Sequence, residues 1–176
     1  MGNAESPRRS SVPRDEPMDG DADPAAVLAA FVRELAEARR RLDLTLTSLS
    51  EALGITPMAV AHWEHGRDAP SAGNFILWAE ALGFKATVLD RADMRYATRA
   101  VPRREENAEQ FRIRSIALLL RDIRREAELT QEMVGEQLQV SAWTIQMWEG
   151  ARRIPRITRL IQWCSVLGCR LALTPM

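Results

Sequence analysis

Residues 129–155 read LTQEMVGEQLQVSAWTIQMWEGARRIP, and the spacing within this stretch decides the fold. Thr130 and Ser141 are good N-cap residues, and each precedes apolar residues at helical spacing. The pattern predicts one helix over about 131–138 and a second over about 142–149, joined by a very short turn. An arginine-rich segment follows the second helix.

The same arrangement occurs twice in the chain. Trp63-Glu64 reappears as Trp148-Glu149, 85 residues later, and at this offset residues 35–88 align with residues 120–173 without a gap. Self-similarity of this kind indicates two copies of one structural unit. We refer to them as the first and second repeats.

Each repeat is predicted to contain four helices and a strand. The helices should cover about 24–42, 46–53, 57–64 and 72–82, and again about 105–127, 131–138, 142–149 and 156–167. Gly83 and Gly168 follow the last helices, as C′ glycines do.

After these glycines the pattern becomes alternating, which predicts strands over residues 84–89 and 169–174. Isolated strands of this length are unstable. Our hypothesis is therefore that the two strands pair with each other. The linker between the repeats, residues 91–104, is able to span at most about 46 Å, which permits this pairing.

Four segments follow from this pattern. Residues 1–22 carry three prolines among polar side chains and are expected to be a disordered tail. Residues 23–90 and 105–176 are expected to be two domains of four helices and a strand each, with the linker between them.

Charge is unevenly distributed, although 24 basic and 24 acidic side chains give a net charge of zero. Residues 1–30 carry 3 basic and 6 acidic side chains, whereas residues 111–176 carry 10 and 6. Zero net charge argues against a general coat for nucleic acid, but the second repeat has a positive field.

Other protein classes are disfavoured. No apolar run approaches the roughly 18 residues of a membrane span, and the first residues lack a secretory signal. Two cysteines, Cys164 and Cys169, do not make a disulfide framework, so we expect a cytoplasmic protein. His62 and His65 are too few for a zinc site, and no nucleophile and base accompany them. We therefore expect no enzyme, no metal and no cofactor.

Both repeats contain one motif: Leu-Thr, two aliphatic residues, a Ser or Thr cap, another aliphatic residue, Trp-Glu, Arg, Pro and a closing Leu-Gly. It comprises Leu44-Thr45, Leu49, Leu53, Thr56, Val60, Trp63-Glu64, Arg67, Pro70 and Leu82-Gly83, and then Leu129-Thr130, Val134, Leu138, Ser141, Ile145, Trp148-Glu149, Arg152, Pro155 and Leu167-Gly168.

The motif resembles the DNA-binding domain of lambda-repressor/Cro-like (XRE-type) regulators. The resemblance implies an all-α fold of two tandem helix-turn-helix domains, with the aliphatic and tryptophan positions in the core. Glu64 and Glu149 are expected to bond locally, near a helix end. The short C-terminal strands further resemble those of toxin–antitoxin repressors, which pair across a dimer.

The resemblance places base-facing positions at the start of the second short helix of each repeat. In the first repeat they are Thr56, Pro57, Met58, Ala59, Ala61 and His62, and in the second Ala142, Trp143, Thr144, Gln146 and Met147. Apart from Thr56, the expected N-cap, only His62 of the first set can read a base edge, whereas Gln146 suits adenine and Thr144 suits a thymine methyl group. Gln131, at a position where the family often contacts DNA, is replaced by Leu46 in the first repeat.

Phosphate contacts are also expected to be stronger in the second repeat. Arg152, Arg153, Arg156 and Arg159 follow its second short helix, and their counterparts are Arg67, Asp68, Ser71 and Asn74. Arginines in this position grip phosphates in family members, although surface arginines can also form only a solvated face.

Met58 and Trp143 occupy equivalent positions where base readers are usually polar. Trp143 can act as a wedge or thymine-methyl contact, can mark a surface where a partner protein docks, or can pack on its own domain. The sequence leaves these three interpretations open.

The sequence therefore predicts a sequence-specific transcriptional regulator that acts on double-stranded DNA as a single-chain pseudo-dimer. Its operator is expected to be asymmetric or pseudo-palindromic, and its second repeat to be the stronger contact. The alternative is a regulatory interaction module, antiactivator-like or antitoxin-like, whose recognition faces bind a protein partner. The oligomeric state stays open.

Overall fold

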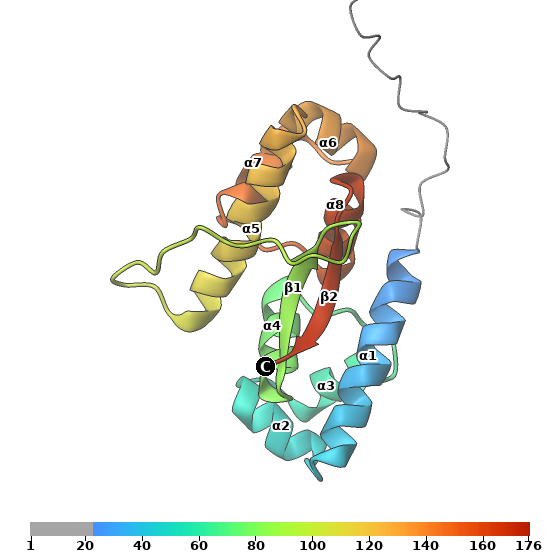
Figure 1. The fold of residues 1–176 in the computed structure, drawn as a ribbon. Helices are drawn as coiled ribbons and strands as arrows, with labels where there is room; N and C mark the ends of the chain where they lie inside the picture. Colours follow the sequence, from blue (N-terminus) through green and yellow to red (C-terminus); the bar gives the residue numbers. More distant parts are fainter. Residues whose placement is uncertain (1–22) are drawn as a thin grey trace, which may run out of the picture.

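The computed structural model describes residues 23–176, which form eight helices and a two-stranded sheet (Figure 1). The expected tail, residues 1–22, lies outside the described residues. In chain order the elements are α1 (Pro24–Arg41), α2 (Leu46–Leu53), α3 (Pro57–Glu64), α4 (Ala72–Ala81), β1 (Phe84–Leu89), α5 (Ala108–Glu126), α6 (Gln131–Leu138), α7 (Ala142–Glu149), α8 (Ile157–Val166) and β2 (Arg170–Pro175). The predicted fold, two tandem helix-turn-helix units with paired terminal strands, is confirmed.

Polar N-caps fix where the short helices begin. The hydroxyls of Thr45, Thr130 and Ser141 accept hydrogen bonds of 3.0–3.2 Å from the backbone three residues on. Helix α5 begins later than the sequence predicted, at residue 108 rather than about 105. The reason is a capping box, in which Asn107 and Gln110 each bond the other's backbone N–H.

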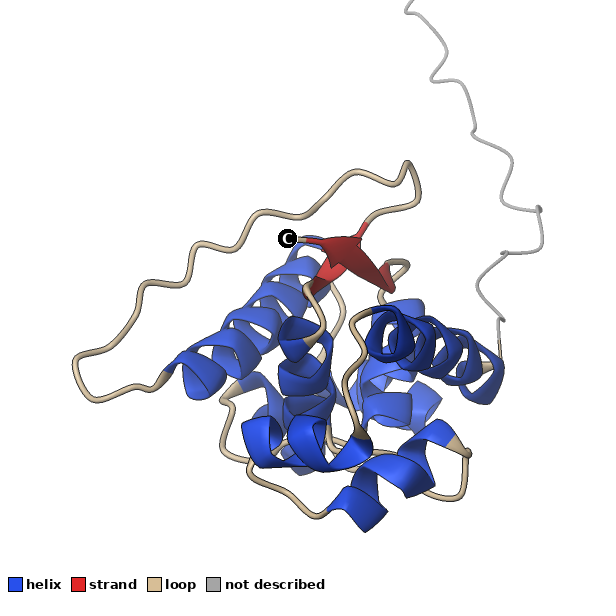
Figure 2. Cartoon of the chain, turned by 90° about the horizontal axis from the view of Figure 1, so that it is seen from below, coloured by secondary structure: helices blue, strands red, loops and turns tan. Residues whose placement is uncertain are grey.

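The two strands form an antiparallel ribbon, as predicted. Its register places Thr87 opposite Ala172, which is the equivalent residue of the other repeat. Strand β2 covers residues 170–175 instead of 169–174, and Cys169 before it is buried. Figure 2 shows the ribbon with the helices on one side of it and the linker on the other.

A second contact between equivalent residues joins the loops that precede α4 and α8. Ser71 and Arg156 form an antiparallel bridge. The Ala72 amide donates to the Pro155 carbonyl over 3.0 Å, and the Ile157 amide donates to the Pro70 carbonyl over 3.1 Å. The repeats therefore meet through matching residues at two separate places.

Helices of the two repeats also pack against each other. Helix α1 of the first repeat lies against α8 of the second, and α5 of the second lies against α4 of the first. The buried side chains form one hydrophobic cluster to which both repeats contribute. In each half a tryptophan pair lies at its centre, Trp63 with Trp78 and Trp148 with Trp163, with ring centroids 5.7 Å apart.

An ion pair ties the first helix of each repeat to the end of its third helix, and it is buried in the second repeat and half-buried in the first. Arg124 donates to both carboxylate oxygens of Glu149 over 2.5 and 3.0 Å, and also to the Leu129 carbonyl. Arg39 and Glu64 repeat this arrangement at 2.7 and 2.8 Å. The expectation that each glutamate bonds locally is therefore wrong, because its partner is an arginine 25 residues upstream on another helix.

The linker is anchored at both ends. At its start, the Tyr96 amide donates to the Val88 carbonyl over 3.0 Å. At its far end, Arg114 donates to both carboxylate oxygens of Glu106 and to the Val101 carbonyl. The hydrogen bonds from Arg114 lower the pKa of Glu106 from 4.5 to about 2.

We expect Arg124→Met to lower the free energy of unfolding by about 3 kcal/mol, because it leaves the Glu149 carboxylate buried without its partner. Urea denaturation followed by circular dichroism measures the change. The exposed neighbour serves as a control, since Arg125→Met should change stability by less than about 0.5 kcal/mol. Replacing both partners, Arg124→Met with Glu149→Leu, should recover most of the loss. If Arg124→Met and Arg125→Met lowered the free energy of unfolding equally, the stabilising role of the Arg124–Glu149 pair would be contradicted.

A second prediction concerns how the stability of the protein depends on pH through the Glu106–Arg114 ion pair. Because folding lowers the pKa of Glu106, this pair stabilises the protein above pH of about 4.5, and the contribution disappears as the pH falls towards about 2. Glu106→Gln should therefore lower the melting temperature at pH 7, and the difference from the unchanged protein should shrink between these two pH values. Melting curves across this range test it, with the exposed Glu105→Gln as control. A difference independent of pH would exclude the ion pair as its cause.

Candidate nucleic-acid interface

Helix α7 has one buried side and one open side. Ile145 and Trp148 are buried in the core, which fixes the rotation of the helix. The expected base-facing residues lie away from this core: Trp143 and Gln146 are exposed, and Ala142, Thr144 and Met147 are half-buried. The structure thus brings the five predicted residues of the second repeat onto one surface.

Helix α3 is oriented in the same way by Val60 and Trp63, but its open surface carries few polar groups. Met58 is 63% exposed, and Ala59 and His62 are half-buried. Thr56 serves as the N-cap, its hydroxyl accepting from the Ala59 amide over 3.3 Å. Arg67, after the helix, is exposed.

Trp143 contacts its own repeat on one face. The guanidinium carbon of Arg153 lies 4.6 Å from the centroid of the Trp143 ring, a cation–π arrangement. The ring is nevertheless 50% exposed. Of the three interpretations of Trp143, packing on its own domain accounts for one face of the ring, and the other face is open to a ligand.

The four arginines that follow α7 fall into two pairs. Arg156 donates to the Asp68 carboxylate over 2.8 Å and to the Ala69 carbonyl over 2.6 Å, both in the first repeat. Arg159 donates to the Leu138 carbonyl at the end of α6. These two guanidinium groups hold parts of the fold together, which the sequence did not predict.

Arg152 and Arg153 form the other pair. Both are exposed, and within residues 23–176 neither forms an ion pair. Arg159 is not in an ion pair either, but it is half-buried and its guanidinium is used by the Leu138 carbonyl and the Gln162 amide oxygen. Arg152 and Arg153 are therefore the fully exposed members of the set without an acidic partner. As phosphate contacts, all four arginines stay predictions.

Gln131 also has a partner inside the protein. Its amide nitrogen donates to Glu149 over 2.7 Å and so joins the buried pair with Arg124. Leu46 occupies the equivalent place in the first repeat and has no side-chain polar group to do the same. The side chain expected to contact DNA is thus used, in this structure, to support the end of α7.

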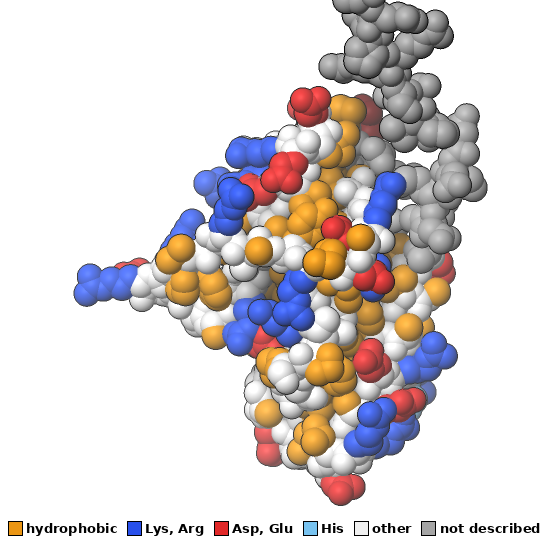
Figure 3. All heavy atoms as spheres, in the orientation of Figure 1, with side chains coloured by type: hydrophobic (Ala, Val, Ile, Leu, Met, Phe, Trp, Pro, Cys, Tyr) orange, Lys and Arg blue, Asp and Glu red, His pale blue; other side chains and the backbone are white. Residues whose placement is uncertain are grey.

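The distribution of charge distinguishes the two recognition helices. Lys and Arg side chains gather along the edge formed by α5 and α7, as the space-filling view shows (Figure 3). The Asp68 carboxylate lies after α3, and the Ala69 amide and the Arg156 guanidinium lower its pKa. The residue equivalent to Asp68 in the second repeat is Arg153, so an acidic side chain paired with Arg156 follows α3 where a basic side chain stacked on Trp143 follows α7.

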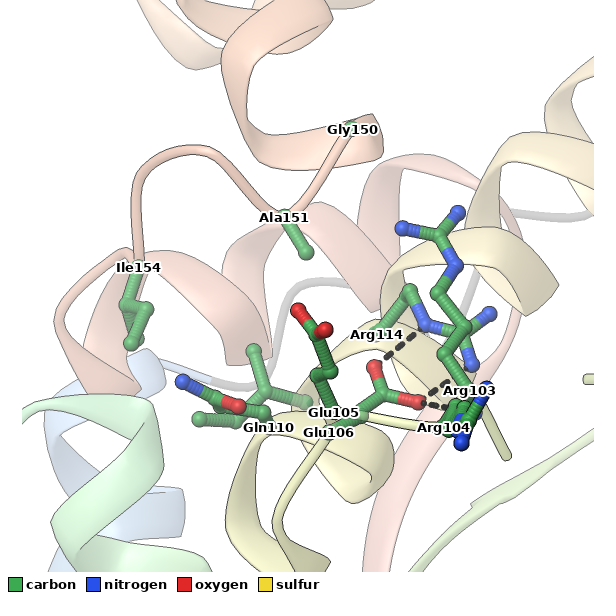
Figure 4. Close-up of a pocket in the computed structure, with 10 residues that line it drawn as sticks. Arg103, Arg104, Glu105, Glu106, Gln110, Arg114, Gly150, Ala151 and Ile154 are labelled. Atoms are coloured by element: carbon green, nitrogen blue, oxygen red, sulfur yellow. Dashed lines mark hydrogen bonds and ion pairs between the residues drawn. The ribbon is translucent and has the colours of Figure 1, made fainter.

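Two basic residues near α7 were missed by sequence reasoning. Arg103 and Arg104, at the end of the linker, line a cleft of about 500 Å³ together with Gly150, Ala151 and Ile154, which follow α7 (Figure 4). Both arginines are exposed. Their only signal in the sequence was the basic character of the linker, which does not show what the linker lies against.

Two other kinds of site can be checked in the described part of the chain. Between residues 23 and 176, no three His, Cys, Asp or Glu side chains group as metal ligands. No helix in that range is both long enough and apolar enough to cross a membrane. The open surfaces of α3 and α7 are therefore the candidate functional site.

A comparison with known protein families matches both repeats. The helix-turn-helix family matches residues 35–89 and again residues 120–173. No curated protein and no solved structure gives a significant match to the chain. The two matched segments cover most of the chain and contain α2 with α3 and α6 with α7. The protein therefore belongs to the lambda-repressor/Cro-like helix-turn-helix family of DNA-binding regulatory domains, and it carries two tandem copies of the domain.

Proposed function

We propose that the protein is a sequence-specific transcriptional regulator that binds double-stranded DNA as a single-chain pseudo-dimer. The observation that carries the proposal is the pairing of equivalent residues, Thr87 with Ala172 in the ribbon and Ser71 with Arg156 in the loops. Contacts of this type are what a twofold axis produces in a homodimer. Here both halves belong to one polypeptide.

A twofold arrangement has a direct consequence for the DNA site. Dimeric helix-turn-helix proteins contact half-sites that lie about 34 Å apart on one side of the duplex. A chain with two related but unequal halves would read two unequal half-sites. We propose a pseudo-palindromic or asymmetric operator.

The second repeat makes the stronger contact in this proposal. Helix α7 presents Gln146 and Thr144, which can bond base edges, and the free charges of Arg152 and Arg153 adjoin it. Helix α3 presents Met58 and alanines instead, with Arg67 as its nearest uncompensated arginine. Base reading is thus assigned mainly to α7.

A second candidate function follows from that apolar surface. Met58 is 63% exposed in the first turn of α3, and the protein as a whole has no net charge. These features suit a regulatory interaction module in which α3 binds a protein partner. A gel shift against genomic fragments at physiological salt separates the two functions, because absence of specific DNA binding would favour the interaction module.

Substitution in the two repeats tests the asymmetry, once bound fragments have been selected and sequenced. Arg152→Ala should weaken operator binding by about 1–3 kcal/mol and reduce the slope of log affinity against log salt by about one. The equivalent Arg67→Ala should lose less, and Gln146→Ala should lose more than His62→Ala. Fluorescence anisotropy at several salt concentrations gives both quantities. Equal losses in the two repeats would refute the unequal roles.

Tryptophan fluorescence tests whether the open surface of α7 is the interface. Trp143 is 50% exposed, and the other four tryptophans are at most 7% exposed. Iodide should therefore quench mainly Trp143, and operator DNA should protect it. Trp143→Phe should remove most of the quenchable signal. Operator binding that left the quenching of Trp143 unchanged would place the DNA elsewhere.

A further inference from the structure

A cavity of about 550 Å³ lies between the two repeats, beneath the linker. Its walls come from β1 and α4 of the first repeat, from α5 of the second, and from the linker itself. Small-molecule sites in proteins typically have volumes of roughly 300–1,000 Å³. The cavity is therefore large enough for a small organic ligand. None of the residues proposed to contact DNA lines it.

The inner wall of this cavity is mainly apolar. Ile76, Val88, Ile116 and Leu119 line it, and Tyr96 and Phe111 add aromatic rings. Burial raises the pKa of Tyr96, so its phenol stays protonated and uncharged at neutral pH. An apolar or aromatic ligand body would remove water from these surfaces.

Positive charge is in excess at the cavity. Arg112 is paired with Glu80, and Glu106 is paired with Arg114. Lys85 and Arg95 also line the cavity, and within residues 23–176 neither is in an ion pair, although Lys85 lies near enough to Glu80 to attract its carboxylate. Three basic side chains thus line the cavity against two acidic ones. The Arg95 guanidinium donates to a neutral group, the Thr174 hydroxyl, over 3.2 Å. Basic side chains lie among apolar ones at the centre of this face in Figure 3.

The cavity also has a definite outer wall. The linker that crosses it is held by the Tyr96–Val88 hydrogen bond at one end and by the Arg114 contacts to Glu106 and Val101 at the other. Thr98 and Pro102, between these anchors, line the cavity. The anchored linker therefore forms one wall of the site, and a ligand beneath it would touch both repeats.

The geometry points to a binding site for a small organic anion, with an apolar or aromatic body against Ile116 and Val88 and a carboxylate between Lys85 and Arg95. A neutral molecule of the same shape would fill the cavity without using the uncompensated charges. A metal ion is not suited to it, because the uncompensated groups are cationic.

Occupation of this site would affect the recognition helices. Helix α5 contacts both α4 and α7, and its Arg124 holds the end of α7 through Glu149. A ligand between α5 and β1 therefore changes how the second repeat sits on the first. This regulatory consequence rests on the proposed DNA binding, whereas ligand binding itself does not.

Isothermal titration calorimetry of the full chain with 2-naphthoate, in the absence of DNA, tests the site. We expect one saturable site per chain, and at least tenfold weaker binding of the neutral analogue 2-naphthamide. Lys85→Met combined with Arg95→Met should weaken naphthoate binding at least tenfold. The control Arg125→Met, an exposed arginine of α5 outside the cavity, should leave it unchanged.

A variant that fills the cavity tests the site without changing any charge. Thr98→Trp fills the cavity from the exposed linker without altering the core, and it should abolish naphthoate binding while the melting temperature stays the same. Absence of saturable binding, equal binding of the amide, or binding unaffected by the Lys85, Arg95 and Thr98 changes would each overturn the site. Operator affinity measured with and without naphthoate then tests regulation separately, since loss of DNA binding alone does not alter the calorimetric result.

Discussion

The antiparallel pairing of β1 with β2 is the constraint on which the arrangement of the repeats depends. A six-residue strand at the end of a small helical unit exposes unpaired N–H and C=O groups along its edge. The chain satisfies these groups by placing the equivalent strand of the other repeat beside it, with Thr87 opposite Ala172. Once that register is set, the loops at Ser71 and Arg156 can meet as well. One backbone requirement thus orients both helix-turn-helix units.

Packing reinforces this orientation. Because α1 lies against α8 and α5 against α4, the first helix of each repeat buries apolar surface on the other repeat. The same first helices carry Arg39 and Arg124, which hold the ends of α3 and α7. The contact between the repeats and the position of the recognition helices therefore share the same two helices. Helix α5 thus contacts α4 of the first repeat on one side and α7 of its own repeat on the other.

Symmetry of the scaffold contrasts with inequality of the surfaces. Both repeats keep the caps, the buried tryptophans and the Arg–Glu pair, because these residues serve the fold. The exposed positions differ: Met58 and Trp143 are equivalent and both apolar, but Arg153, which stacks on Trp143, is replaced by Asp68 in the first repeat. A fused chain allows this divergence, since each half is free to change its surface without changing its partner's, whereas the subunits of a homodimer change together.

The sequence by itself determined the repeat, the short helices and the strands, because N-caps such as Thr130 and the apolar period act over a few residues. Tertiary structure alone decided that Gln131 supports Glu149, that Arg156 bonds Asp68 across the repeats, and that the linker covers a cavity. These contacts join residues between 18 and 88 positions apart, and no local pattern records which side chains meet at such separations. The reason is physical: caps and periodicity are local properties of the backbone, whereas partners are chosen by packing of the whole chain.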